Sequence, residues 1–253
     1  SIDGGSLKFD YFSPDEKNRL SVFASAANTD RDSYYGPGND PLKAYGKTTD
    51  LTAMGGAQYV HTFDKCFFMP SDLTAGLEYN RDRLKDNMWG YNRHTDQTVN
   101  IYSAFLQNEW KNDRWGILIG GRLDKHNMVD NVIFSPRANL RFNPTQNINL
   151  RLSYSSGFRA PQAFDEDMHI ENVGGTVAMI ERAKDLKEEK SQSFSVSADM
   201  YHRFGAFQTN LLIEGFYTRL TDVFVLGKPY DRGDGILVKT RSNGPGAKVM
   251  GLT

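Results

Sequence analysis

The sequence has a single cysteine, Cys66, among its 253 residues. One cysteine cannot form an intramolecular disulfide, and it excludes both a cysteine-rich zinc site and a redox pair. The sequence also has no run of about eighteen apolar residues, which excludes a transmembrane helix. It does not exclude a membrane β-barrel, because each barrel strand carries only about ten residues of alternating polarity.

An excess of charge of one sign is also absent. The 30 basic and 31 acidic residues are well mixed and give a formal net charge of −1. Without a basic stripe we expect no nucleic-acid partner. Aromatic residues make up 12% of the chain, which is too many for a disordered protein. The composition therefore indicates a folded, aromatic-rich chain of one large or two ordinary domains.

Catalytic motifs are missing too. The sequence contains no Gly-x-Ser-x-Gly, no phosphate loop and no His-Glu-x-x-His, and its five histidines are scattered. We therefore expect no enzyme and no resident cofactor. Five acidic or histidine residues crowd the segment Asp165–Glu171, but their spacing differs from that of an EF-hand loop. We interpret this segment as a solvated loop and expect no metal site.

Regular alternation of apolar and polar residues is what the sequence does contain. In the segment Asn147–Ser155 the even-numbered positions are apolar and the odd-numbered positions are polar, so an extended chain has two unlike faces. Gly157–Pro161 ends the alternation, because proline has no donor for a sheet ladder. This two-faced strand leads into a long loop, which we place at residues 157–190.

Similar alternation predicts about eleven strands, with short turns at one end and long loops at the other. The strands are ten to seventeen residues long, and their second face is rich in polar side chains. This pattern favours an all-β, transmembrane antiparallel β-barrel with a polar lumen over a soluble sandwich, which has shorter strands and a dry core. The only helix expected is at Val177–Lys190, inside the long loop, and another loop is expected at Lys85–Asp96, between two strands.

Aromatic residues gather at one end of these strands. Trp110 and Trp115 flank the short turn Lys111–Arg114, as the tryptophans of an interfacial aromatic girdle do. The alternative is a cross-strand tryptophan pair in a soluble sheet. The segment Asp64–Ser71 is unusually apolar for a turn, which fits the rim of a membrane.

One stretch carries a family likeness. The segment SPRANLRFNPTQNINLRLSYSSGFRAPQ, preceded by AFLQNEWKNDRWGILIGGRLDKHN, resembles the middle of the barrel domain of TonB-dependent outer-membrane receptors. Its Gly157–Pro161 signature follows a strand ending in Tyr-Ser-Ser, and Asn243–Gly251 is similar to an Asn-x-Gly-x-x-Lys-x-x-Gly pattern with an insertion. The stretch FRAPQAFDEDMHIENVGG resembles the branch common in Bacteroidetes.

The resemblance implies a barrel of about 22 strands in the outer membrane of a Gram-negative bacterium, closed by an N-terminal plug. Such a receptor imports a scarce ligand, such as a ferric chelate (a siderophore complex), haem or cobalamin, with energy delivered through TonB. Its implied partners are outer-membrane lipid, its own plug domain, TonB and a surface lipoprotein. Residues 1–253 would form about half of the barrel, without the plug and the first and last strands. We expect this half not to be a stable soluble monomer, because its sheet edges would be unpaired.

Two sets of side chains are candidate functional residues. Charged residues expected to face the lumen are Glu78, Glu109, Arg122, Arg137, Arg141 and Arg151. We interpret most of these as pairing with each other across strands, the alternative being contact with the plug or a ligand. Candidate ligand contacts in the extracellular loops are Trp89, Tyr91, Arg159, Phe164, Phe224 and Tyr230.

Two other functions stay open from the residues alone. A soluble or surface-attached β-rich module for adhesion or carbohydrate binding would be a monomer without detergent. An outer-membrane barrel hydrolase would need a serine, a histidine and an acid that converge in space.

Overall fold

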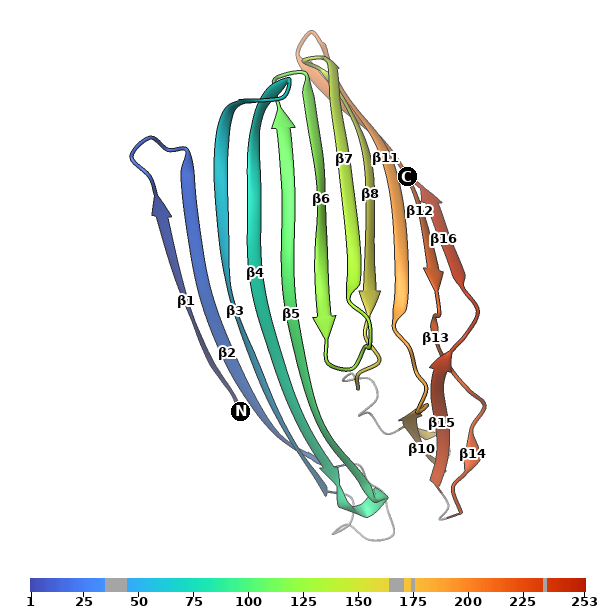
Figure 1. The fold of residues 1–253 in the computed structure, drawn as a ribbon. Coiled ribbons are helices and arrows are strands. Elements are labelled where there is room, and N and C mark those ends of the chain that lie inside the picture. Colours follow the sequence, from blue (N-terminus) through green and yellow to red (C-terminus); the bar gives the residue numbers. More distant parts are fainter. Residues whose placement is uncertain (35–44, 164–170, 174–175, 234–235) are drawn as a thin grey trace.

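The computed structural model describes residues 1–34, 45–163, 171–173, 176–233 and 236–253 (Figure 1). Eleven strands form the main antiparallel sheet in chain order: β1 (Ile2–Phe12), β2 (Asn18–Tyr34), β3 (Tyr45–Cys66), β4 (Met69–Met88), β5 (Arg93–Lys111), β6 (Trp115–His126), β7 (Ile133–Thr145), β8 (Ile148–Arg159), β11 (Glu189–Phe204), β12 (Phe207–Thr221) and β16 (Ala247–Leu252). Within the described residues, no helix has the length and apolar character needed to cross a membrane.

A second, smaller sheet is built from the long loops. Its strands are β9 (Glu171–Val173), β10 (Thr176–Arg182), β13 (Phe224–Leu226), β14 (Tyr230–Asp231) and β15 (Ile236–Asn243). β10 and β15 pair in parallel although more than fifty residues separate them in the sequence. A single 3-10 turn, η1 (Trp89–Tyr91), joins β4 to β5.

The main sheet has an apolar face and a polar face, as the alternation predicts. Tyr79 of β4 lies opposite Tyr102 of β5, and Trp115 of β6 lies opposite Phe142 of β7. Their rings are in contact, with centroids 4.9 Å apart in the first pair and 4.2 Å apart in the second. We call this apolar face the outer face, and the polar face the inner face.

The sheet is curved and open, with β1 and β16 as its edge strands (Figure 1). A hollow of about 430 Å³ on the inner face is lined by six consecutive strands, from Gln58 of β3 to Ser155 of β8. One hollow can span six strands only where the sheet curves towards it, so the inner face is concave. This architecture is a segment of a barrel wall, and the predicted fold class is confirmed.

The apolar band of the outer face has the height of a membrane core. On β5 it runs from Trp110 to Tyr102, a distance of about 27 Å at roughly 3.4 Å per residue. A strand tilt of about 40° reduces this to about 21 Å, close to the ~25 Å band of outer-membrane barrels. Beyond Tyr79, the outer face of β4 continues with Arg81 and Arg83, so the long strands extend past the band into water.

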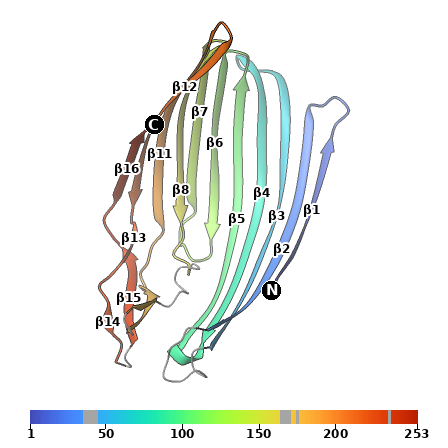
Figure 2. The ribbon, with the colours of Figure 1, turned by 180° about the vertical axis from the view of Figure 1, so that it is seen from behind.

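Short turns and long loops lie at opposite ends of the main sheet, as expected (Figures 1 and 2). We call these the short-turn end and the long-loop end. At the long-loop end, Met88, Tyr91, Met179 and Ile236 form a buried cluster that joins β4 and η1 to the second sheet. Gly46 lies beneath it, where a Cβ atom would stand 1.7 Å from the sulfur of Met88. The loops are therefore packed onto the strand ends.

Two predictions about local structure are wrong. The segment Val177–Lys190 is not a helix, since β10 covers its first part and β11 begins at Glu189. Its alanine, glutamate and lysine residues favour a helix, but pairing with β15 decides the backbone conformation. The predicted loop at Lys85–Asp96 is mostly strand, because β4 and β5 continue as a hairpin up to η1. The charged residues there mark strands that have left the apolar band, and they do not indicate a loop.

Candidate functional site

A polar hollow of about 360 Å³ lies at the long-loop end, beside the buried cluster. Its lining residues are Asn92–Thr95, Ala163, Met179–Arg182 and Arg232. Three of these are arginines and one is a glutamate, Glu181, whose Oε1 lies 3.9 Å from Arg232 Nη1, so arginines outnumber acidic side chains in the lining. We call it the outer hollow. Guanidinium groups in such a hollow bind planar anionic oxygen ligands through paired hydrogen bonds.

Arg182 is fixed by the strand on the other side of the hollow. Its Nη1 donates to Gln97 Oε1 at 2.9 Å and to the carbonyl oxygen of Pro161 at 3.0 Å. Gln97 Oε1 also accepts a hydrogen bond from the backbone N–H of Ala163 at 2.8 Å. One buried glutamine of β5 therefore holds both the start of the loop after β8 and an arginine of β10.

The same loop start is tied to β6 through His126, which is fully buried just past the apolar band. The backbone N–H of Met128 donates to His126 Nδ1 at 3.0 Å, so the proton is on Nε2, which donates to Gln162 Oε1 at 3.2 Å. Burial lowers the pKa of His126, which agrees with a neutral ring. His126 thus has a structural role in positioning residues 160–163.

Arg93 is held by a buried carboxylate. Its Nε and Nη2 donate to Asp86 Oδ2 at 3.1 and 2.8 Å, and Thr48 Oγ1 donates to Asp86 Oδ1 at 2.7 Å. Arg232 reaches the site from the second sheet, where its Nη2 donates to the carbonyl oxygen of Tyr91 at 2.9 Å. All three arginines are therefore fixed by described contacts, and the hollow is preformed.

The structure places the predicted ligand contacts of the loops in unlike environments. Trp89 is 57% exposed on η1, and Tyr230 is 48% exposed on β14. Tyr91 is only 8% exposed and packs in the buried cluster, and this burial raises the pKa of its hydroxyl. Trp89 and Tyr230 can meet a ligand from solvent, whereas the ring of Tyr91 is part of the core.

Two further predicted contacts are brought together although they are distant in the sequence. The guanidinium of Arg159, at the end of β8, lies 5.6 Å from the ring centroid of Phe224 on β13. This cation–π geometry presents a charge and an aromatic surface side by side. Phe164 lies outside the described residues.

The six charged residues expected to face the lumen share the inner face by register. Arg122 Nη1 lies 2.6 Å from Glu78 Oε2, and its Nε lies 2.8 Å from Asp124 Oδ1. Ser103 Oγ donates to the same Asp124 oxygen at 2.6 Å. This group is a network of paired charges across three strands, and it includes two of the six candidates, Glu78 and Arg122.

The other inner-face charges do not follow that interpretation. Within the described part of the chain, Glu109, Arg137, Arg141 and Arg151 form no ion pair. Arg141 lies directly opposite Arg151 and donates to two backbone carbonyls of the β5–β6 turn, while Arg151 Nε donates to Asn149 Oδ1 at 2.8 Å. Arg137, Arg141 and Arg151 therefore form a basic strip on the inner face. The two opposed arginines of this strip repel each other.

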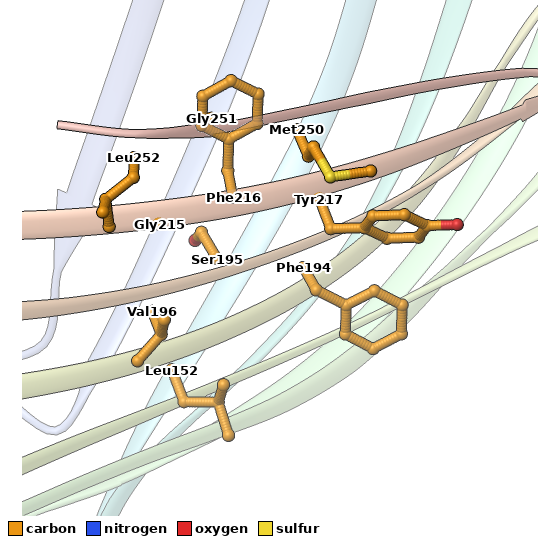
Figure 3. A pocket seen from close by; sticks show the side chains of 10 residues that line it. All are labelled: Leu152, Phe194, Ser195, Val196, Gly215, Phe216, Tyr217, Met250, Gly251 and Leu252. Atoms are coloured by element: carbon orange, nitrogen blue, oxygen red, sulfur yellow. The ribbon is translucent and has the colours of Figure 1, made fainter.

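An apolar hollow of about 560 Å³ has a different nature (Figure 3). It lies over β8, β11, β12 and β16, and side chains of the outer face line most of it, including Leu152, Val196 and Leu252. Figure 3 shows the rings of Phe194 and Tyr217 side by side along its margin. It is a groove in the apolar band and not a site for a polar ligand.

Sequence reasoning missed Gln97 and the arginines 93, 182 and 232. Each is an ordinary polar residue in its own segment, and only the folding of three loops onto one another brings them together. In the described part of the chain, no three His, Cys, Asp or Glu side chains are grouped so that they could hold a metal ion. Residues 165–170 of the acidic segment lie outside that part.

The chain is similar to solved structures of receptors. It aligns with the siderophore receptor PirA from Acinetobacter baumannii at 17% identity and a TM-score of 0.72, covering 99% of this chain and 41% of that one. A mutant of the ferric enterobactin receptor PfeA from Pseudomonas aeruginosa, in complex with enterobactin, aligns at 18% identity and a TM-score of 0.72, with 99% and 40% covered.

The FrpB iron transporter from Neisseria meningitidis aligns at 14% identity and a TM-score of 0.69, with 99% and 40% covered. The chain thus spans about two fifths of the length of these proteins, and at such identities the likeness shows the fold. No curated protein sequence gives a match. The Bacteroidetes branch stays a prediction.

A family profile described as TonB dependent receptor-like, beta-barrel matches residues 3–252. That family consists of receptors and transporters, so the match favours a receptor barrel over the two alternatives, the hydrolase and the soluble adhesion module. The match covers nearly every residue and agrees with the curved, two-faced sheet. The chain therefore belongs to the TonB-dependent receptor β-barrel family, whose members lie in the outer membrane of Gram-negative bacteria.

Proposed function

We propose that this chain forms part of the wall and the ligand entrance of a receptor that takes up a ferric siderophore by TonB-dependent active transport. The observation that carries the proposal is the outer hollow, a preformed site lined by three arginines at the long-loop end of a barrel wall. The names of the similar structures, two siderophore receptors and an iron transporter, support the same ligand class.

The chemistry of the hollow suits an anionic chelate. Catecholate and carboxylate oxygens that bind ferric iron leave negative charge on the surface of the complex, and guanidinium groups bind such oxygens in pairs. Arg93, Arg182 and Arg232 supply these groups. The exposed rings of Trp89 and Tyr230 add flat apolar surface for aromatic parts of a ligand.

The Arg159–Phe224 pair forms a second part of the proposed entrance. It lies where the chain leaves β8, at the family signature Gly157–Pro161. We include Phe164 in the entrance as a prediction from the sequence. The ring of Tyr91 is not included, because it is buried in the cluster that supports the hollow.

The proposal extends to the inner wall. The basic strip of Arg137, Arg141 and Arg151 supports a wall that contacts acidic groups of a plug domain filling the lumen. Coupling to TonB, and contact with a surface lipoprotein, belong to the full-length receptor.

Uptake of iron tests the proposal. A strain that lacks the gene is complemented with the full-length receptor and supplied with ferric siderophores, haem or cobalamin as the sole source of iron or cobalamin. We expect growth and labelled-iron uptake on a ferric siderophore. Growth on haem or cobalamin alone would assign the receptor to that ligand and reject the siderophore proposal.

Variants of the hollow test its role. Arg182→Gln and Trp89→Ala each remove a proposed contact, and we expect the apparent Kd for the ferric siderophore to rise about tenfold, equal to about 1.4 kcal/mol. Arg182→Lys keeps the charge but loses the paired geometry, so it should recover only part of the affinity. Asp113→Asn, in the exposed β5–β6 turn at the other end, is the matched control and should bind as the unaltered receptor does.

A further inference from the structure

Glu181 places a negative charge among the arginines of the outer hollow. Among the described residues that line the hollow, it is the one acidic side chain. Its Oε1 lies 3.9 Å from Nη1 of Arg232, which is beyond hydrogen-bond distance, and its side chain is 49% exposed. Arg232 is held by its hydrogen bond to the carbonyl oxygen of Tyr91. The carboxylate of Glu181 is therefore accessible to a ligand, and it is not needed to fix the arginine.

The edge of β10 explains why Glu181 and Arg182 share one hollow. β15 pairs with β10 along one edge from Val177 to Arg182, whereas β9 pairs with the other edge only from Thr176 to Ala178. The four residues of β10 that follow, 179–182, all line the hollow. Successive side chains of a strand point to opposite faces, and both faces are within reach of a ligand that lies along the edge. The same ligand therefore meets the carboxylate and the guanidinium.

Two of the three arginines already face a carboxylate. Arg93 donates two hydrogen bonds to Asp86, whose side chain is 1% exposed, and Arg232 lies beside Glu181. The positive charge that the hollow offers to a ligand is therefore smaller than that of three guanidinium groups alone. A chelate with only negative charge would bring its oxygens close to Glu181, and like charges repel strongly where water is partly excluded.

We propose that Glu181 makes the outer hollow selective for ferric chelates of mixed charge, in which an ammonium group lies beside the anionic oxygens. The arginines bind the oxygens of such a chelate, and Glu181 accepts hydrogen bonds from its ammonium group. A fully anionic chelate leaves Glu181 without a donor and is repelled by it. This inference rests on the proposed uptake of a ferric siderophore, and it names the class of siderophore that the hollow takes.

Two synthetic ferric tris-catecholates on one scaffold test the selectivity. The first keeps its full negative charge, and the second carries added ammonium groups that balance this charge. We expect the full-length receptor in detergent to bind the balanced chelate with a Kd about tenfold lower. Glu181→Gln keeps the shape of the side chain but removes its charge, and it should abolish this preference. Glu188→Gln is the matched control, because Glu188 pairs with Lys190 at 3.0 Å outside the lining, and it should keep the preference.

The possible results separate this inference from the proposed function. Tighter binding of the fully anionic chelate by the unaltered receptor, or an unchanged preference in Glu181→Gln, overturns the role of Glu181. Glu181→Asp keeps the charge on a shorter side chain and should keep the preference, so its loss in this variant would also reject selection by charge. If the receptor binds neither chelate but supports growth on a ferric siderophore, only this inference is rejected. If growth on ferric siderophores fails as well, the proposed function is rejected with it.

Discussion

The two ends of the main sheet are stabilised in different ways. At the long-loop end, strands, η1 and the second sheet share a buried cluster and a buried ion pair between Asp86 and Arg93. At the short-turn end, the contacts are local turns, ring stacks on the outer face and exposed ion pairs such as Lys17 with Asp64. The first end is a small protein core beyond the apolar band, whereas the second is held by local contacts.

This difference matters for function. A ligand site needs side chains held at fixed positions, and hydrogen bonds to Gln97, to Asp86 and to the carbonyl oxygen of Tyr91 provide this for the arginines of the outer hollow. Turns at the other end have no site to hold, so each closes with its own backbone and side-chain hydrogen bonds. We therefore expect substitutions to have large effects at the long-loop end and small effects at the short-turn end.

The largest expected effect is the loss of the buried carboxylate. Asp86→Ala removes the buried carboxylate that accepts two hydrogen bonds from Arg93, and we expect a loss of about 3–5 kcal/mol in the stability of the long-loop end. Amide hydrogen exchange of η1 and β10 in the full-length receptor measures this. The exposed pair Lys85 and Asp96 joins the same two strands, so Asp96→Ala should have almost no effect, and equal effects would contradict the comparison.

A cavity in the buried cluster comes next. Met179→Ala removes a side chain that is fully buried between the two sheets, and we expect a loss of about 2–5 kcal/mol. The same exchange measurement applies, with binding of the ferric siderophore as a second readout. Leu226→Ala, which truncates a half-exposed side chain of the second sheet, is the control and should cost about 1 kcal/mol or less.

A smaller effect concerns pH. Burial, together with the nearby charge of Asp50, raises the pKa of Asp82 to about 6 from its usual 3.8. The folded state thus holds a proton that the unfolded state releases, so stability falls as the pH rises from about 4 to about 6. Asp82→Asn removes this penalty, and we expect it to stabilise the receptor by about 1 kcal/mol at pH 7, after allowance for solvent screening.

Thermal unfolding of the receptor at pH 4 and pH 7 checks this prediction. The stabilisation by Asp82→Asn should be present at pH 7 and nearly absent at pH 4. A gain of the same size at both pH values would show that the carboxyl charge is not its cause.

The smallest effect is expected at the short-turn end. The hydrogen bond between Lys17 and Asp64 raises the pKa of Lys17, but both side chains are exposed to water. We expect Lys17→Met to leave the unfolding temperature within experimental error. A clear destabilisation would mean that exposed pairs support this end, which would remove the contrast with the long-loop end.

Much of the main sheet could be predicted from the sequence. The alternation along Asn147–Ser155 gives the faces of β8 correctly, and the tryptophans on either side of the β5–β6 turn mark the edge of the apolar band. The number of strands in the main sheet also agrees with the expected count of about eleven. Each of these features depends on neighbouring residues along one strand or one hairpin.

The candidate site could be predicted only in part. Trp89 and Tyr230 are exposed, as we expect of aromatic ligand contacts in loops, but Tyr91 is buried. No feature of the neighbouring sequence distinguishes these three residues. The helix predicted at Val177–Lys190 failed because β10 pairs with a strand more than fifty residues away. Local propensity is weak compared with backbone pairing of this kind.

The sequence by itself determined which side of each strand meets lipid and which meets water, because side chains alternate with a period of two in any extended chain. It also determined where the short turns lie. Only the tertiary structure decided the outer hollow, since its arginines come from β5, β10 and the segment before β15. Contacts between such distant segments depend on how the loops fold onto the strand ends, and no pattern within one segment encodes them.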